Sequence, residues 1–276
     1  PFMIAAETGL GLRPAEEYLF AVIGSPARPS SVEPKPLRLW AVPEYIRAAP
    51  GGTGAAKCGG NYGGAHIAQR QAAANDCDQG VWLDAQERRY IEEAGSANLF
   101  FVESTSAGPR LRTPPLSGTL LAGITRDSIL RLARSLGYPV TEDALTLDEW
   151  EQSCRDGRIT ETFACGTALA VVPVGHVTSA WRDWSVGDGT AGPATSRLRE
   201  ALLDIHGGQA PDEFGWRSDA NHPVECANIA FDAPRQPIRE YERGNSPDTQ
   251  HPDRHDHFGD LGGGQYAHGR NAEQRH

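Results

Sequence analysis

The chain has no apolar run that approaches the about 18 residues of a membrane-spanning helix. It also has no stretch in which basic, apolar and cleavage regions follow one another as in a signal peptide. Positive charge is scarce, because 26 Lys and Arg face 36 Asp and Glu and the net charge is -10. Nucleic acids and anionic membranes require a basic surface. We therefore expect a soluble, cytoplasmic protein whose partner is a small molecule, with no nucleic acid and no membrane bound.

Paired cysteines and clustered metal ligands are also missing. The five cysteines are scattered and include no CxxC pair, which favours free thiols in a reducing compartment. The histidines of the chain's body, His66, His176 and His206, stand alone, whereas zinc sites need ligands at short spacings. We expect no metal site.

One glycine-rich stretch, residues 51–62, stands out because it holds a lysine, Lys57, among very small side chains. A nucleotide phosphate loop needs Gly before the lysine and Ser or Thr after it, but Ala56 and Cys58 occupy these positions. Two interpretations remain. Lys57 could act as an amine that forms a Schiff base with a carbonyl compound or pyridoxal phosphate, or the stretch could be a surface loop with a solvated lysine.

The remaining pattern predicts a mixed α+β fold with enough residues for one large core or two modest ones. The predicted strands are residues 2–6, 18–23, 37–42, 81–84, 90–93, 99–102, 159–164 and 169–174, and the predicted helices are 63–75, 126–135, 147–155 and 193–205.

Two adjacent carboxylates, Glu92 and Glu93, end a predicted strand. Successive strand residues point to opposite faces. One carboxylate could therefore be solvated while the other is neutralised by an arginine, or one could face inward against a cation.

Two features could bind a ligand through the backbone. Gly123 and Thr125 precede a helix, and the free N–H groups and dipole of a helix N-terminus favour an anion. The small residues 165–168 lie between two predicted strands and allow a ligand to approach the backbone closely.

The last part of the chain, residues 217–276, has few large apolar residues, well below the roughly 20% that marks disorder. It also contains His251, His255 and His257, for which we expect no functional metal binding. We predict a disordered, dispensable tail.

Taken together, four blocks in the first 216 residues give the chain a likeness to a known family. They are Gly51-Gly52-Thr53-Gly54-Ala55-Ala56-Lys57 with Gly59-Gly60-Asn61-Tyr62, Glu93-Ala94-Gly95-Ser96-Ala97-Asn98-Leu99-Phe100, Leu121-Ala122-Gly123-Ile124-Thr125-Arg126, and Gly166-Thr167-Ala168. The chain resembles the pyridoxal-phosphate enzymes of fold type IV, specifically a branched-chain amino acid aminotransferase. The resemblance implies a Schiff base on Lys57 and a contact between Glu93 and the pyridine nitrogen.

The resemblance also implies the remaining contacts. Backbone N–H groups of Ile124 and Thr125 and the hydroxyl of Thr167 would bind the phosphate. Tyr62 would lie beside the cofactor, and Ala168 would lie near the substrate carboxylate, which Thr167 also helps to bind.

The implied domain organisation has three parts. Residues 1–42 are strands at the end of a small domain and the interdomain region, residues 43–216 form the large pyridoxal-phosphate-binding domain with a sheet or barrel core and flanking helices, and residues 217–276 form the tail. The family's small N-terminal domain, with an arginine for the phosphate, would precede Pro1, and the full-length form would be a homodimer. We therefore expect this chain alone to bind the cofactor weakly and to be nearly inactive.

The activity that the resemblance implies is amino transfer between Leu, Ile or Val and 2-oxoglutarate, which becomes glutamate. A D-amino acid aminotransferase or aminodeoxychorismate lyase of the same fold agrees less well with the Gly-Gly-Thr-Gly and Gly-Gly-Asn-Tyr blocks. An inactive, truncated relic is the third possibility. Two positions depart from the family: Ala122 replaces a usual proline, and Leu169 and Val172 replace the redox CxxC of the animal enzymes.

Overall fold

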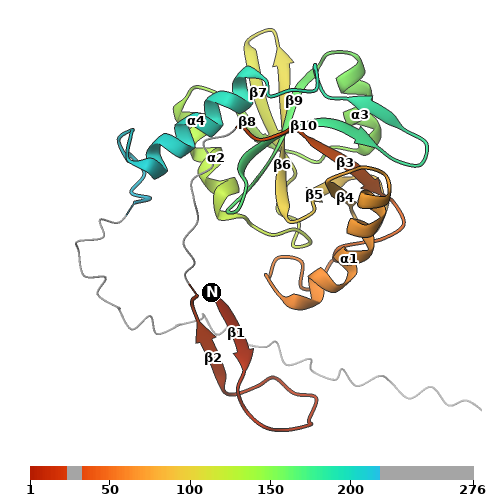
Figure 1. Cartoon of the computed structure of the whole chain (residues 1–276), viewed down its shortest axis with the longest axis vertical. Helices are drawn as coiled ribbons and strands as arrows, with labels where there is room; N and C mark the ends of the chain where they lie inside the picture. Colours follow the sequence, from red (N-terminus) through yellow and green to blue (C-terminus); the bar gives the residue numbers. More distant parts are fainter. Residues whose placement is uncertain (24–32, 218–276) are drawn as a thin grey trace, which may run out of the picture. The chain divides into compact units, whose positions relative to one another are not determined.

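The computed structural model describes residues 1–23 and 33–217 (Figure 1). The predicted α+β fold is confirmed. Its helices are α1 (Gly59–Ala74), α2 (Ile124–Ser135), α3 (Leu147–Arg155) and α4 (Pro193–Gly207). Its strands are β1 (Phe2–Ala5), β2 (Tyr18–Ala21), β3 (Leu37–Val42), β4 (Gln79–Leu83), β5 (Ile91–Ala94), β6 (Ala97–Thr105), β7 (Gly108–Thr113), β8 (Val140–Glu142), β9 (Ile159–Gly166), β10 (Ala170–Thr178) and β11 (Asp183–Ser185).

The first two strands form a separate antiparallel hairpin, with Phe2 opposite Ala21 and Ala5 opposite Tyr18. Its apolar side chains are exposed, among them Met3 and Phe20. The two strands were expected from the sequence, with turn residues between them; the structure adds that they pair with each other.

The larger sheet closes on itself. A continuous path of paired strands runs β10–β3–β4–β5–β6 and returns to β10 through β9. Strand β9 closes the ring because Ala164 pairs with Leu99 of β6 on one side and with Val172 of β10 on the other. Strands β7 and β8 extend the sheet beyond β6, and β11 extends it beyond β10.

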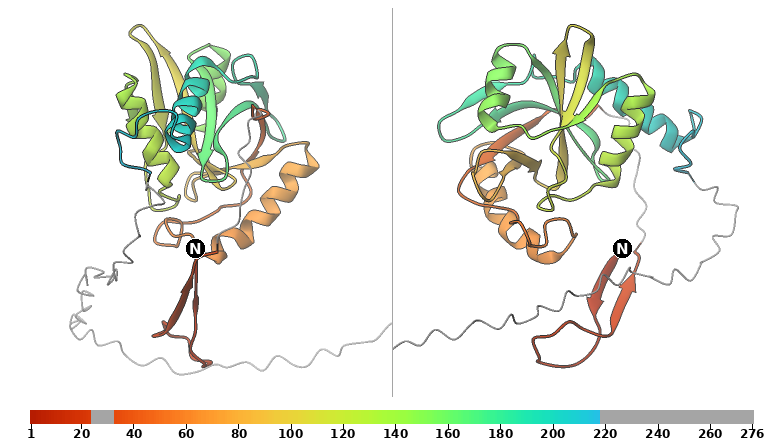
Figure 2. Two further views of the ribbon diagram at one scale, coloured as in Figure 1. Left: turned by 60° about the vertical axis from the view of Figure 1, so that its left-hand side comes forward. Right: turned by 180° about the vertical axis from the view of Figure 1, so that it is seen from behind.

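Hydrophobic cores lie on both faces of this sheet. Along β6, Leu99 and Phe101 belong to one core and Phe100 and Val102 to the other, as the two-residue period of a strand requires. Helix α3 packs on the first face, and α2 and α4 pack together on the second (Figure 2). The second core includes a stacked pair, Phe100 and Phe163, with ring centroids 5.1 Å apart. Both faces of the central strands are therefore dry.

Strand β3 lies inside the sheet, between β10 and β4, although the sequence analysis assigned it to residues 1–42, before the large domain. We propose that the large domain begins with β3. The predicted tail, residues 217–276, lies outside the described residues except for Arg217.

Helix α1 begins at Gly59, four residues before the predicted start at residue 63. The glycines disfavour a helix, but side-chain hydrogen bonds made by Asn61, described below, hold its first turn in place. No helix within residues 1–23 and 33–217 combines the length and hydropathy that crossing a membrane requires.

Candidate active site

The loop between β3 and α1 presents Lys57, which is exposed, immediately before the first residues of α1. A buried asparagine fixes this loop. The amide of Asn61 donates to the carbonyl oxygens of Thr53 and Ala56, both at 2.8 Å, and accepts from the Thr53 hydroxyl at 2.7 Å. These hydrogen bonds within the loop fix the backbone around Lys57, although the neighbouring residues have almost no side chains.

The same loop lies tightly against the segment that leads into α2. Gly54 is buried, and a Cβ placed on it would be 2.5 Å from Cα of Thr119. Only glycine fits at this distance, because real Cβ atoms do not approach backbone atoms so closely. The loop that carries Lys57 and the segment that leads into α2 are thus in direct backbone contact.

Glu93 is buried beneath this contact, with its side chain 2% exposed. One carboxylate oxygen lies 2.5 Å from Nε of Arg47, and the other accepts the backbone N–H of Leu121 at 3.2 Å. Burial raises the pKa of Glu93 to about 7, against the opposing effects of the Arg47 guanidinium and the Leu121 N–H. Glu93 thus faces inward against a cation, and that cation is an arginine, the partner that the other alternative had expected for one of the two carboxylates.

Glu92 is also buried, so the alternative in which one of the two carboxylates is solvated is wrong. It points away from Glu93 as strand alternation requires, and its Oε1 accepts the hydroxyl of Thr119. Burial raises its pKa, against the effect of this hydrogen bond. Strand β5 is covered on both faces, which the sequence pattern did not reveal.

The N-terminus of α2 is open. Its N-cap residue is Gly123. The N–H groups of Ile124 and Thr125 have no intrahelical partner, as at any helix start, and no side chain caps this first turn in their place. The amide of Asn98 donates to the Leu121 carbonyl at 3.0 Å and holds the approach to the helix.

Four of the predicted site residues line one cavity of about 380 Å³. They are Ile124 and Thr125 from α2 and Thr167 and Ala168 from the turn between β9 and β10. The cavity is completed by Ser128, Gly166, Leu169, Ala170, Arg199, Leu202, Leu203 and His206. Glu93 is connected to it through Leu121, three residues before Ile124. The spacing of the sequence blocks could not show this convergence.

Tyr62 lies elsewhere. It lines a smaller cavity of about 180 Å³ together with Trp82, Gly95 and Ser96. Gly95 and Ser96 form the turn that directly follows β5, two and three residues after Glu93. Tyr62 is therefore near the strand of Glu93 but does not share the cavity of Thr125 and Thr167.

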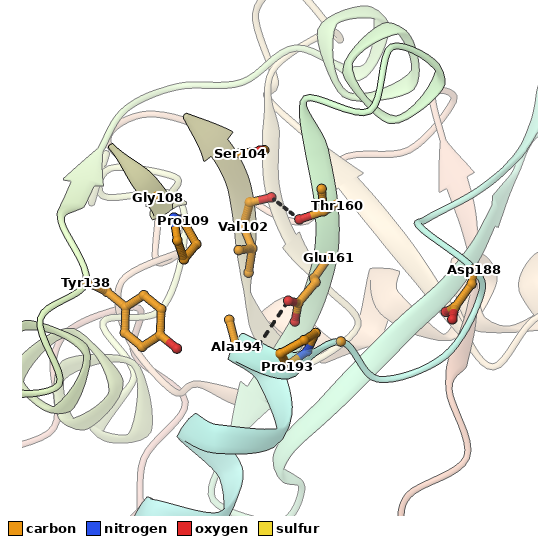
Figure 3. Close-up of a pocket in the computed structure, with 11 residues that line it drawn as sticks. Val102, Ser104, Gly108, Pro109, Tyr138, Thr160, Glu161, Asp188, Pro193 and Ala194 are labelled. Carbon is orange, nitrogen blue, oxygen red and sulfur yellow. Dashed lines mark hydrogen bonds between the residues drawn. The ribbon is translucent and has the colours of Figure 1, made fainter. Parts of the chain in front are cut away.

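A larger cavity, of about 500 Å³, lies at the N-terminal end of α4 (Figure 3). Here the free N–H groups of the helix are already used, because the buried carboxylate of Glu161 accepts from Ala194 at 3.0 Å and from Thr195 at 2.8 Å. An anion would be repelled by this carboxylate. The open N-terminus of α2 is the better anion site.

The residues that organise the site were not all visible in the sequence. Asn61 and Asn98 lie within the blocks quoted above, but their composition does not reveal which carbonyls they bind. Arg47 lies outside every block, and nothing in the sequence distinguishes it from a surface arginine.

Cys58, Cys77, Cys154 and Cys165 are free thiols, as predicted, and Cys226 lies outside the described residues. In the described part of the chain, no three His, Cys, Asp or Glu side chains are grouped to hold a metal ion.

The closed sheet thus brings a lysine loop, a buried carboxylate and an open helix N-terminus together. Residues 2–177 match the family described as amino-transferase class IV, and the chain belongs to this family. The fold type IV architecture expected from the sequence is confirmed by the solved structures to which the chain is similar.

Three relatives give the detail. A branched-chain-amino-acid aminotransferase of Mycolicibacterium smegmatis is 50% identical over 222 residues, 80% of this chain and 60% of that protein. The solved branched-chain amino acid aminotransferase of Escherichia coli is 33% identical, with a TM-score of 0.57 over 68% of this chain and 58% of the other. A solved branched-chain amino acid aminotransferase of T.th., complexed with N-(5'-phosphopyridoxyl)-L-glutamate, has a TM-score of 0.57 at 34% identity over 68% and 56%. The chain thus spans about 60% of the length of its curated relative.

Proposed function

We propose that this chain binds pyridoxal 5'-phosphate through Lys57 and belongs to an enzyme that transfers amino groups between branched-chain L-amino acids and 2-oxoglutarate. The single observation that carries the proposal is the convergence on the approach to α2. Glu93 binds Leu121, and the helix that follows shares a cavity with Thr167 and Ala168. The segment from Leu121 to Thr125 thereby joins Glu93, the carboxylate proposed for the ring nitrogen, to the N–H donors proposed for the phosphate.

The residues fit this cofactor on the chemistry of the donor set. The uncapped first turn of α2 supplies N–H donors, which favour a phosphate dianion. The buried Glu93 carboxylate, which already pairs with the Arg47 guanidinium, is suited to a basic ring nitrogen because a nearby anion favours its protonated form. When bound, the cofactor supplies an electron sink that stabilises the carbanion formed at the substrate α-carbon.

Lys57 and Glu93 carry the chemical roles in this proposal. Lys57 would hold the cofactor through its side-chain amine, and the same amine would move the substrate α-proton as a general base and acid. Glu93 holds a proton on the ring nitrogen, because a nearby anion favours the protonated form of that nitrogen.

The remaining residues bind and orient. Backbone N–H groups of Ile124 and Thr125 and the hydroxyl of Thr167 bind the phosphate. Thr167 and the Ala168 backbone would orient the substrate carboxylate. Tyr62, although it lines a separate cavity, is proposed to lie beside the cofactor. The exposure of Thr167 and Ala168 and their shared cavity with Thr125 support these contacts.

The substrate class rests on the relatives. The curated relative is named a branched-chain-amino-acid aminotransferase, and a solved relative is complexed with an L-glutamate adduct of the phosphopyridoxyl group. Both are consistent with Leu, Ile and Val as amino donors and with a glutamate/2-oxoglutarate pair. A homodimer is proposed for the whole protein by the same similarity.

The chain offers a clean test of cofactor attachment, because Lys35 and Lys57 are its only lysines. Borohydride reduction in the presence of pyridoxal phosphate, followed by peptide mass analysis, should give the adduct on Lys57. The variant Lys35→Arg should keep the full yield, and Lys57→Arg should lose it. An adduct of equal yield on Lys35 would refute the assignment.

Transamination distinguishes the alternative functions. With leucine, isoleucine and valine offered beside D-alanine, and 2-oxoglutarate as acceptor, we expect turnover that is small for this chain alone and confined to the branched L-amino acids. Turnover of D-alanine instead would identify a D-amino acid aminotransferase. A chain that folds but forms no adduct on Lys57 would be a relic.

A further inference from the structure

Arg47 is a deeply buried arginine beside the site, and the proposed function gives it no role. It lies in the loop between β3 and α1, and its side chain is 5% exposed. A buried guanidinium is costly unless its donors are used. The contacts of Arg47 therefore indicate what it does.

Its donors bind three separate segments. Nε lies 2.5 Å from the Glu93 carboxylate on β5. Nη1 donates to the carbonyl of Gly54 in the lysine loop at 3.1 Å and to the carbonyl of Thr119 before α2 at 2.7 Å. The rigid fork of an arginine suits this geometry, and a lysine has no equivalent of it.

These segments are the ones that carry the proposed cofactor contacts. Gly54 is three residues before Lys57, and Thr119 is five residues before Ile124. Glu93 completes the link, because its second oxygen accepts the N–H of Leu121 at 3.2 Å. Arg47 and Glu93 together thus connect the lysine loop, strand β5 and the start of α2.

Resting on the proposed function, we propose that Arg47 is a positioning residue. Its guanidinium fixes the direction of the Glu93 carboxylate and the spacing between the lysine loop and the start of α2. It contacts neither substrate nor reacting atoms in this proposal. It acts by holding in register the groups that do.

A variant series separates positioning from mere structural support. Arg47→Met removes the charge and the guanidinium donors but keeps a side chain of similar length. Arg47→Lys keeps the positive charge and loses the forked donor geometry of the guanidinium. The matched control is Arg112→Met, since Arg112 is also mostly buried and binds Glu103, Glu149 and the carbonyls of Asp143 and Ala144. Its partners lie on β6, on α3 and in the segment between β8 and α3, and none of them is a proposed cofactor contact.

The first measurement is the affinity for pyridoxal phosphate, by absorbance titration of each folded variant. We expect Arg47→Met and Arg47→Lys to weaken binding at least tenfold and Arg112→Met to change it less than twofold. Equal affinities in the Arg47→Met and Arg112→Met proteins would overturn the proposal. Full affinity in Arg47→Lys would show that charge alone suffices, which also overturns it.

The second measurement needs no cofactor. Urea unfolding at pH 8 of the unsubstituted chain, Arg47→Met, Glu93→Gln and the double variant forms a double-mutant cycle. We expect the loss of Arg47 to change the unfolding constant at least tenfold more when Glu93 is present than when Gln replaces it. An additive cycle would overturn the proposal, and if Arg47→Met does not fold, Arg47→Lys takes its place in the cycle.

The adduct assay on Lys57 and the double-mutant cycle together distinguish a failure of this inference from a failure of the proposed function. Coupling between Arg47 and Glu93 without any adduct on Lys57 in the unsubstituted chain would count against the proposed function and against a cofactor role of Arg47. An adduct on Lys57 with additive Arg47 and Glu93 would leave the proposed function intact and remove Arg47 from it.

Discussion

Glu93 illustrates how burial and pairing compete at one residue. Burial raises its pKa from 4.5 to about 7 although Arg47 and the Leu121 N–H oppose the shift. The folded state without cofactor therefore holds the proton more tightly than the unfolded chain does. The stability from this group is fully present below about pH 4.5 and is lost as the pH rises through about 7.

Replacing Glu93 with Gln should remove this pH dependence, because the amide does not titrate. In urea unfolding of the cofactor-free protein at pH 5 and pH 8, the unsubstituted chain should lose up to about 3 kcal/mol more than Glu93→Gln. The exposed Glu200→Gln serves as the control and should behave like the unsubstituted chain. The same decline in Glu93→Gln would mean that another group is responsible.

The same substitution tests the proposed chemistry in the loaded protein. A neutral amide does not hold the ring nitrogen protonated, so Glu93→Gln should leave much of the cofactor binding in place. It should slow removal of the leucine α-proton by several orders of magnitude. Exchange of that proton with deuterated solvent, followed by NMR, measures the step. Nearly unchanged exchange would place the essential carboxylate elsewhere.

Gly54 allows the contact between two loops to be tested with a single methyl group. Its Cβ would overlap the backbone of Thr119, so Gly54→Ala should destabilise the fold by about 1–3 kcal/mol. Gly63→Ala in α1 is the matched control, because nothing lies within 4 Å of its Cβ and alanine favours a helix by about 0.5–1 kcal/mol. Urea unfolding that shows Gly54→Ala to be as stable as Gly63→Ala would disprove the close approach.

At the scale of elements, α4 depends on a carboxylate from the neighbouring sheet. Glu161 on β9 accepts from the first N–H groups of α4, and a Cβ on Gly192 would overlap its carboxyl group. Figure 3 shows this cap. Because α4 also supplies Arg199 and Leu202 to the candidate cavity, the cap links the docking of the helix to the site.

Removing the cap should be costly. Glu161→Ala should lower the free energy of unfolding by about 2–3 kcal/mol, since two charge-assisted hydrogen bonds are lost and their donors stay buried. Glu200→Ala, an exposed residue on the same helix, should stay within about 0.5 kcal/mol of the unsubstituted chain. Thermal denaturation of both variants measures the difference. Equal midpoints would show that the cap contributes nothing.

The elements that the sequence predicted well are those with strong local patterns. The bounds of β3 and α3 were predicted as observed. The structure adds that the Thr146 side chain caps the N-terminus of α3. Strands β8 and β11 were missed because three residues are too short to show a period. Strand β7 was missed because it begins with Gly108 and Pro109, which usually indicate a turn.

The candidate site was predictable in its blocks but not in its connections. Lys57, Glu93 and Thr125 stand in recognisable surroundings. The contacts of Asn61, Asn98 and Arg47 depend on segments far apart in sequence that only folding brings together. Local patterns carry no information about such contacts.

At the scale of the whole molecule, the ring of strands predicts where stability is concentrated. Strand β9 pairs with β6 and β10 and is buried on both faces, whereas β8 pairs with β7 and β11 with β10, each as a short extension of the sheet. Opening β9 breaks the closed ring and both cores at once. Opening β11 leaves the ring closed and removes only Trp184 from the first core, so the two strands should unfold with different free energies.

Amide hydrogen exchange of the cofactor-free protein tests this order. Amides in the middle of β9 and β6 should exchange only through global unfolding, with a free energy equal to that from urea. Amides of β11 and of the loop at residues 51–57 should exchange roughly a hundredfold faster or more through local opening. Cofactor binding should then slow exchange in the loop, where Lys57 attaches, and in β9, because it stabilises the folded state against global unfolding. Exchange in β11 should change little, because its local opening does not release the cofactor. If β9 exchanges as fast as β11, the closed ring is not the stable centre of the molecule.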